Sequence, residues 1–431
     1  MPGNSTTSVM RSVEHQIQAA LALAEPLESL TLTLGDAHGC VLAADVQAAY
    51  PVPAFPTAAI DGYAVNAALT IRAGHRGDAG MPTRSFDVVD WLQPGFTTDQ
   101  PVVGNEAVHV TAGTMIPATC TAVVGAGTNP PGQSTAQFAR CVIDIRDAVD
   151  VGAGIASAGS LAGCDDVVLP AGTVLTDRAI AAAAAVGRSR VSVHPQPRVV
   201  IMTVGDHLID AGQAIVEGLV HDATSAMLLS AARAAGAVAF RGGPVQRHPD
   251  AISAALEDQC VRADLIVVLS AVESDDDVAE DVVVQALRVS GEPDIDFCGI
   301  SPGSRIGLTT AGPDTVPVVT IESGALSAFV GFEVIVRPMI AAMAGRREVF
   351  RSVERAIIDS TVADVPPKPT FLPSLTTTDP LTGELRVQPM RESAQSASLW
   401  LYRADSIMII PANVTSLLEG DEVTVVRLSQ S

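Results

Sequence analysis

The stretch Arg198-Val199-Val200-Ile201-Met202-Thr203 decides the fold class of this chain, and Gly205-Asp206 follows it one residue later. Nearly every side chain in the stretch is apolar, which is typical of a strand buried on both faces of a sheet. Similar apolar runs occupy residues 265–269 and 316–321, and helical patterns alternate with them at residues 225–235, 249–260, 282–287 and 327–343. Apolar strands that alternate with helices predict a parallel sheet covered by helices on both faces.

The sequence around this α/β pattern is of two other kinds. Residues 12–24 carry apolar side chains at helical spacing and predict a first helix. Residues 50–150 and the tail from residue 350 consist of short β-type runs separated by Gly, Pro, Thr and Asn. We therefore divide the chain into four parts: an α/β domain of residues 8–25 and 192–345, a connecting domain of residues 26–47 and 146–191, a small β domain of residues 48–145, and a C-terminal β domain of residues 346–431.

The composition excludes several classes of function. The 431 residues include 26 Lys and Arg against 48 Asp and Glu, and Lys368 is the only lysine. Nucleic acids and anionic membranes bind basic surfaces, so we expect no nucleic-acid partner. The longest apolar stretch that we identify, residues 179–186, is too short to cross a bilayer, so we expect no direct membrane insertion. The six cysteines show neither a CxxC pair nor zinc spacing, which favours buried thiols in a cytoplasmic protein.

A proline-flanked turn carries a carboxylate that could do chemistry. Pro53 and Pro56 fix an extended approach to Asp61-Gly62-Tyr63. A carboxylate held on such a turn could serve a metal ion or act as a base. Taken alone, however, the Asp-Gly pair is an ordinary signal of a β-hairpin.

Several strings occur together in one order along the chain. They are Asp61-Gly62-Tyr63-Ala64-Val65, Thr111-Ala112-Gly113-Thr114-Met115-Ile116-Pro117, Ala171-Gly172-Thr173-Val174-Leu175, Gly205-Asp206 after a strand, Pro302-Gly303 and Arg337-Pro338. With this ordered set the chain resembles the molybdopterin molybdenumtransferase family, which includes the bacterial MoeA proteins and the gephyrin E domain. The resemblance implies an elongated homodimer whose subunit has a three-layer α/β domain, a small β domain and a C-terminal domain like a β-barrel. It also implies the family reaction, in which molybdate is inserted into adenylylated molybdopterin, with magnesium, and AMP is released.

The segments that would hold phosphate in that family are altered here. Its glycine-rich loop reads Ser270-Ala271-Val272-Glu273-Ser274-Asp275-Asp276-Asp277, and its lysine-bearing segment reads Ser301-Pro302-Gly303-Ser304. The early glycines are lost, and a β-branched residue does not easily adopt the positive φ that glycine allows. We therefore expect a negative wall of Asp275, Asp276 and Glu322 that faces Asp61 and repels phosphate.

Some family positions remain. The resemblance assigns Asp61, Asp206 and Asp277 as catalytic remnants, which we expect to be inactive. It assigns Gly205, Ser274, Pro302 and Gly303 as vestiges of the cofactor site. It supports no assignment of metal ligands in this chain.

Two hypotheses of different classes follow. The favoured one is a catalytically degenerate homodimeric scaffold that binds a short peptide of a partner protein, as gephyrin does within the resembled family. The matching positions are Glu14 and Ile17 on the first helix and Pro411 in the last domain, although Ile17 could instead pack in the core. By analogy, the partner is the C-terminal tail of the division protein FtsZ, with a membrane receptor as a further partner, recruitment to the division site and no cofactor. The alternative is an active molybdopterin molybdenumtransferase, which would use magnesium and molybdopterin.

Overall fold

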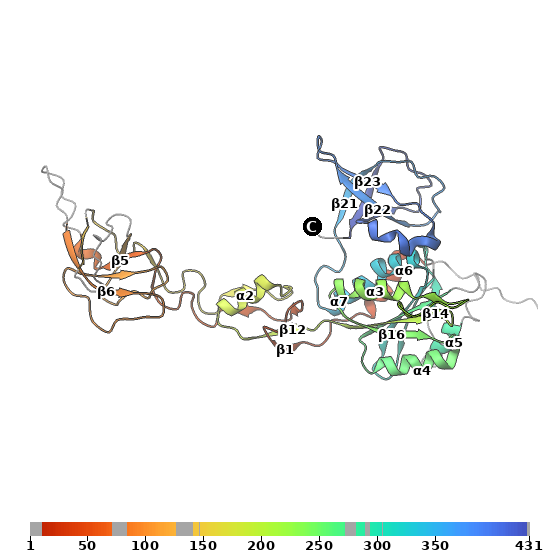
Figure 1. Cartoon of the computed structure of the whole chain (residues 1–431), viewed down its shortest axis with the longest axis horizontal. Coiled ribbons are helices and arrows are strands. Elements are labelled where there is room, and N and C mark those ends of the chain that lie inside the picture. Colours follow the sequence, from red (N-terminus) through yellow and green to blue (C-terminus); the bar gives the residue numbers. More distant parts are fainter. Residues whose placement is uncertain are drawn as a thin grey trace, which may run out of the picture.

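The computed structural model describes residues 11–70, 84–125, 141–145, 147–271, 282–288, 294–303 and 305–428. Its parts lie in a row and give the molecule an elongated shape (Figure 1). A small β domain that contains β5 (Gly62–Val65) lies at one end, and the helix α2 (Asp177–Ala185) lies in the middle. The large α/β sheet lies at the other end beside a β-barrel. The expected class, α/β plus β in an elongated subunit, is confirmed.

The α/β part is built on one six-stranded sheet with the order β16-β13-β17-β20-β19-β18. Four neighbouring strands run parallel: β16 (Val238–Val245), β13 (Arg198–Val204), β17 (Leu265–Ser270) and β20 (Val316–Glu322). The other two, β19 (Arg305–Ala311) and β18 (Asp294–Phe297), are antiparallel. The three apolar strands predicted from the sequence are confirmed and pair parallel, and the two antiparallel strands extend the sheet at one edge.

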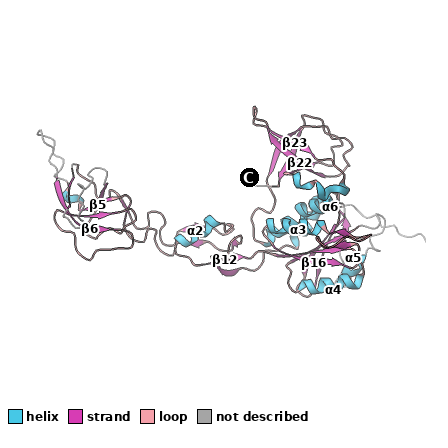
Figure 2. Cartoon of the chain, in the orientation of Figure 1, coloured by secondary structure: helices cyan, strands magenta, loops and turns pink. Residues whose placement is uncertain are grey.

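Alternation of side chains along β13 explains why helices cover both faces of the sheet. Val199 is buried in the core beneath α3 (Ala223–Ala234), whereas the next residue, Val200, is buried in the core shared with α4 (Pro249–Cys260) and α5 (Val282–Leu287). Successive residues of a strand point to opposite faces, so both must be apolar when both faces are covered. Figure 2 shows helices on the two sides of this sheet.

A long apolar helical segment closes the α/β part. It consists of α6 (Ala325–Gly331), a π-helical turn η5 (Phe332–Val336) and α7 (Arg337–Met343), and α1 (Val13–Ala22) packs against its second half. By length and composition the segment could cross a membrane. The expectation that residues 179–186 are the longest apolar stretch was therefore wrong. In the structure 61% of this segment is buried inside the protein, as in a core helix.

The remaining strands form small sheets and a barrel. Beside α2, β1 (Leu30–Thr33), β12 (Arg190–His194) and β2 (Val41–Leu42) make one sheet, and β3 (Val46–Gln47) pairs with β11 (Val167–Leu169). The small β domain has the order β8 (Ala122–Gly125), β5, β7 (Glu106–Val110), β6 (Arg84–Leu92) and β9 (Cys141–Ile145), and β4 (Thr57–Ala58) pairs with β10 (Ile155–Ala156). The closed barrel has the order β21 (Val353–Ile358), β23 (Leu385–Pro389), β22 (Thr370–Thr378), β24 (Ser406–Ile410) and β25 (Glu422–Arg427).

The barrel is attached to the α/β part through a buried contact. The 3-10 turns η6 (Ala394–Leu399) and η7 (Leu401–Arg403) place Trp400 in a small core that includes Phe329 of α6. A buried tryptophan contributes a large apolar surface to such a contact. The barrel and the α/β part therefore share a hydrophobic interface.

Candidate functional site

The carboxyl ends of β13 and β17 form the switch point of the sheet. From β13 the chain runs through α3 to β16 on one side, and from β17 it runs through α5 to β18 at the opposite edge of the sheet. Ligands of open α/β sheets bind in the crevice at such a point. Gly205 and Asp206 follow β13, and Ser270 ends β17. We call this region the carboxyl edge and take it as the candidate site.

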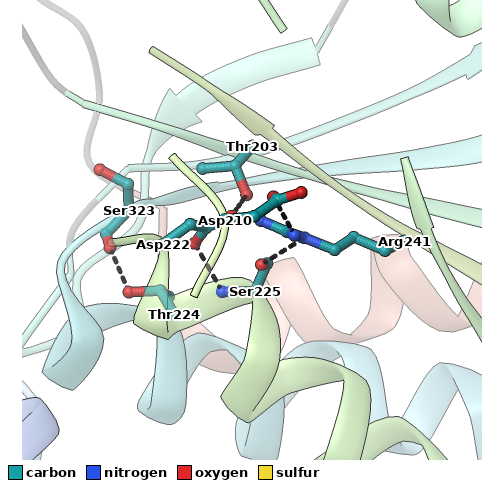
Figure 3. Close-up of polar contacts among 7 residues, drawn as sticks. All are labelled: Thr203, Asp210, Asp222, Thr224, Ser225, Arg241 and Ser323. Carbon is teal, nitrogen blue, oxygen red and sulfur yellow. Dashed lines mark hydrogen bonds and ion pairs between the residues drawn. The ribbon is translucent and has the colours of Figure 1, made fainter. Parts of the chain in front are cut away.

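A polar network fixes the N-terminus of α3 at the carboxyl edge (Figure 3). Asp222 is the N-cap of α3, and its Oδ1 accepts a hydrogen bond from the N–H of Ser225 (3.0 Å). Its Oδ2 accepts from the hydroxyl of Thr203 on β13 (2.9 Å) and from Nη2 of Arg241 on β16 (3.0 Å). The same guanidinium also pairs with Asp210, in the segment between β13 and α3.

This network explains the ionisation of its buried carboxyl group. Burial by itself would raise the pKa of Asp222, but the hydrogen bonds from Ser225, Arg241 and Thr203 outweigh it, so the pKa lies below its usual value. The carboxylate therefore stays charged near neutral pH. This one carboxylate holds together three segments of the carboxyl edge, namely β13, β16 and the start of α3.

A second contact ties α3 to the end of β20. The hydroxyl of Thr224 donates to the carbonyl oxygen of Ser323 (3.0 Å), as Figure 3 shows. The N–H of Ser323 in turn donates to the carbonyl oxygen of Ser270 at the end of β17 (2.9 Å). Hydrogen bonds thus connect α3, the end of β20 and the end of β17 around the switch point.

The described part of the carboxyl edge is mixed in charge. The N–H of Arg247, just after β16, donates to Oδ1 of Asp206 (3.0 Å), and the N–H of Arg305 donates to Oε1 of Glu322 (3.0 Å). Together with Arg241, these arginines come from two strands and one loop of the same edge. Asp275 and Asp276, expected to make a negative wall with Glu322, lie outside the described residues.

The residues predicted as catalytic and cofactor-binding remnants do not all lie in one place. Gly205 and Asp206 lie at the switch point, whereas Ser274 and Asp277 lie outside the described residues. Pro302 and Gly303 form a turn between the carboxyl edge and the barrel. Gly303 has a φ of +82°, and a Cβ there would lie 2.9 Å from Cβ of Ser327, so the turn needs glycine.

Asp61 lies in the small β domain, next to β5. Its Oδ1 accepts a hydrogen bond from the N–H of Ala112 (2.8 Å). A Cβ on the next residue, Gly62, would lie 2.0 Å from the carbonyl oxygen of Val124, so this position also needs glycine. β5 lies at the opposite end of the molecule from β14 (Leu208–Ile209), which follows Asp206 (Figure 1). The expectation that Asp61 faces the carboxyl edge is therefore wrong within one chain, because the connecting part separates them.

The residues predicted to bind a peptide lie together on one cavity. The cavity has a volume of about 810 Å³ and runs between α1, the middle turn η5 of the long helical segment and the barrel. We call it the α1–barrel groove. Glu14, Ile17 and Pro411 all line it. Ile17 is partly buried: it packs against the core of the α/β part, as one alternative expected, and it also lines the groove, where peptide binding stays a prediction.

The α1–barrel groove has an apolar floor with charges around it. Val334, Phe371 and Ile409 are among its apolar lining residues. Lys368, the only lysine of the chain, also lines the groove. Glu333 is a buried carboxylate at its wall, and the guanidinium of Arg351 donates to it through Nε (2.9 Å).

The chain matches known proteins along its whole length. Residues 11–187 match the family model described as the MoeA N-terminal region, domains I and II. Molybdopterin molybdenumtransferase 1 of Mycobacterium tuberculosis is 30% identical over 434 residues, which cover 98% of this chain and 100% of that relative. Molybdopterin molybdenumtransferase 2 of the same organism is 26% identical over 420 residues, with 96% and 99% covered.

The chain belongs to the molybdopterin molybdenumtransferase (MoeA) family. The fold agrees, since a molybdopterin biosynthesis MoeA protein from Pyrococcus horikoshii superposes with a TM-score of 0.80 at 21% identity, covering 98% of this chain and 100% of that one. Against that family background, the network of Asp210, Asp222 and Arg241 is a feature that the sequence analysis missed. The available signal was the sequence Asp222-Ala223-Thr224-Ser225, in which an N-cap aspartate precedes a helix.

No ready-made metal centre occurs in the described part of one chain. Among those residues, no group of three or more His, Cys, Asp or Glu side chains is placed to hold a metal ion. Divalent magnesium is usually bound through one or two carboxylates together with substrate phosphates.

Proposed function

We propose that this protein is a molybdopterin molybdenumtransferase that inserts molybdate into adenylylated molybdopterin. The observation that carries the proposal is the end-to-end similarity, at 30% identity, to a relative that bears this name. The altered phosphate-binding segments by themselves favour a catalytically degenerate scaffold. The comparisons support the enzyme better, because every curated relative reported above is named for the transfer reaction.

The carboxyl edge supports this proposal through its charge. Both substrates are anions. The segment at residues 301–304, which bears lysine in the family, contains no lysine in this chain. Arg241, Arg247 and Arg305 lie along the same edge, where they can attract phosphate or molybdate. Arginine matches the oxygens of phosphate with a planar fork of donors, so it can serve where lysine is absent.

The roles that we assign to this chain are binding and positioning. Arg305 and Arg247 attract the anionic groups of the substrates, and Asp206 holds the segment of Arg247 through its hydrogen bond to the backbone. Asp222 and Arg241 keep α3 in place, with its N-terminus at the edge. Magnesium, if it acts here, is assigned no ligands within one chain, and it would neutralise phosphate charge.

A complete site requires a second copy of the chain under this proposal. Asp61 directly precedes β5 in the small β domain, and β5 lies at the opposite end of the molecule from β14, which follows Asp206 (Figure 1). A homodimer with two-fold symmetry can bring the small β domain of one copy to the edge of the other, twice over. The proposed assembly is therefore a homodimer with two shared sites.

The test mixes two inactive variants. We expect Asp61→Asn and Asp206→Asn each to reduce molybdate-dependent AMP release at least tenfold, whereas exposed Asp177→Asn serves as the control that leaves it unchanged. After subunit exchange, a mixture of the two variants should recover about a quarter of the wild-type activity, because half the dimers then hold one intact site. Wild-type protein that releases no AMP, or a mixture that recovers nothing, contradicts the proposal.

We propose peptide binding in the α1–barrel groove as a second function, which the cavity favours. Its apolar floor and its volume of about 810 Å³ suit an extended or helical segment with several apolar side chains. Lys368 at the wall suits an acidic residue beside them. A C-terminal tail of FtsZ, with a membrane receptor as a further partner, remains the proposal by family analogy for the occupant, together with a place at the division site.

The groove is tested with a labelled FtsZ tail peptide and fluorescence anisotropy. We expect wild-type protein to bind at micromolar concentration. Ile17→Asp should weaken binding at least tenfold, and Lys368→Glu should weaken it less and reduce its dependence on salt. Ile215→Asp, at an exposed apolar residue away from the groove, is the matched control. Equal binding by all four proteins, or none by the wild type, contradicts this function.

A further inference from the structure

Three aromatic side chains form a ladder across the small β domain. Tyr63 on β5 pairs with His109 on β7, and His109 pairs with Trp91 on β6. The rings of Tyr63 and His109 meet edge to face, with centroids 5.3 Å apart. The rings of His109 and Trp91 are stacked, with centroids 4.2 Å apart and planes at 27°. Cross-strand packing of this kind holds each ring in one orientation.

The ladder is buried at one end and open at the other. Tyr63 is 1% exposed, whereas Trp91 is 53% exposed. The other tryptophan of the chain, Trp400, is only 6% exposed and lies in the core beside the barrel. Trp91 therefore presents a large aromatic surface to solvent. Stacking against His109 already fixes the orientation of its ring.

The ladder and Asp61 share one region of the small β domain. Because β5 and β7 pair antiparallel with Gly62 opposite Val110, Asp61 lies two residues further along this sheet than His109 and Trp91 do. Two strand spacings across and two residues along amount to about 12 Å. A ligand as long as a nucleotide-bearing pterin can contact both places.

We propose that Trp91, supported by His109, is a stacking subsite for a planar nitrogen heterocycle of the substrate. This inference rests on the proposed transferase function and assigns a substrate contact to the small β domain. Stacking on an aromatic side chain suits either the pterin or the adenine ring, since both present a π-face. The second oxygen of Asp61 accepts no hydrogen bond from the described residues, so it is available to donors of the same ligand.

The state of His109 suits this role. Burial lowers the pKa of His109, although the charge of Asp61 acts in the opposite direction. The imidazole is therefore neutral near pH 7 and stacks as an uncharged ring. A neutral His109 adds no positive charge behind the ring of Trp91.

The experiment follows the fluorescence of Trp91 in the full-length protein. Trp400→Phe leaves Trp91 as the single tryptophan, and circular dichroism checks its fold; if it does not fold, the difference between wild type and Trp91→Leu reports instead. Neopterin and AMP are titrated separately. We expect saturable quenching of Trp91 by at least one of them, and the stronger quencher identifies the ring that stacks.

Measurements of substrate binding and of AMP release test the stacking subsite and the proposed transferase function separately. Trp91→Leu should bind adenylylated molybdopterin about tenfold more weakly than wild type in calorimetry, whereas Trp91→Phe should retain most of the affinity. If neither compound quenches Trp91, or if Trp91→Leu binds as tightly as wild type, the stacking subsite is refuted even when AMP release is normal. If quenching occurs but the wild type releases no AMP, the stacking subsite stands and the transferase function fails.

Discussion

Nη2 of Arg241 lies 3.0 Å from Oδ2 of Asp222, and this pair joins β16 to the first turn of α3. The side chain of Asp222 is 1% exposed, whereas that of Arg241 is 28% exposed. A buried carboxylate is costly unless charged and polar groups surround it. The carboxyl edge therefore depends on an ion pair that the apolar pattern of the strands does not predict.

Removing the arginine should destabilise the α/β part. Arg241→Ala leaves the carboxylate of Asp222 with only its neutral hydrogen-bond donors, and we expect a loss of about 2–3 kcal/mol in the free energy of unfolding. Arg178→Ala is the matched control, because the pair of Arg178 with Asp177 is almost fully exposed and should contribute nothing measurable. Urea unfolding followed by circular dichroism measures both; equal stability of the two variants would refute the role of the pair.

Acid should remove the contribution of Asp222. Its pKa in the folded protein lies below the ordinary value of 3.8, so the folded state binds fewer protons than the unfolded state in this range. The stabilisation is fully present above about pH 4 and is lost as the pH falls through the folded pKa. Asp222→Asn should therefore be less stable than wild type at pH 6, and the gap should narrow by pH 3. A gap that stays constant in urea unfolding over this range would contradict the assignment.

Gly62 should be irreplaceable next to Asp61. A Cβ at this position would lie 2.0 Å from the backbone oxygen of Val124, which belongs to the adjacent strand. We expect Gly62→Ala to destabilise the small β domain by at least about 3 kcal/mol. Gly125, its partner across the same two strands, has only an ordinary contact with Ile60, so Gly125→Ala should change stability by less than about 1 kcal/mol. Limited proteolysis compares the two variants, and similar resistance in both would exclude the predicted clash.

Thiol reactivity should follow burial. Burial raises the pKa of Cys120 and of Cys298 to about 11, whereas Cys164 is exposed. Native protein should therefore react quickly with a thiol reagent at pH 8 through Cys164. Cys164→Ser should remove the fast phase and Cys120→Ser should leave it. A fast phase that survives in Cys164→Ser would show that the buried thiols are accessible.

Continuous apolar runs made the α/β core predictable. Arg198–Val204 and the later apolar strands are buried on both faces, so their composition alone indicates their place. β19 gave no such signal, because Gly307 and two threonines interrupt it. β22 was not predicted either. Pro373 lies within it and several prolines precede it, and proline is rare inside strands.

The candidate site was less predictable, because its residues meet only in the fold. Gly205-Asp206 could be found, since a turn directly after a buried strand is a local signal. Arg241 and Asp210 carry no local signal: the fold of the sheet brings Arg241 to Asp222, and Asp210 pairs with Arg241. The separation of Asp61 from Asp206 within one chain depends on the length of the connecting part, and no motif reports that length.

The most direct test of the central claim is a single-turnover assay with purified protein, adenylylated molybdopterin and molybdate. The proposed function predicts molybdate-dependent release of AMP, close to one per chain, with molybdenum retained in the pterin product. Unchanged substrate after incubation, from protein whose fold is intact by circular dichroism, would contradict it and would leave peptide binding in the α1–barrel groove as the function to pursue.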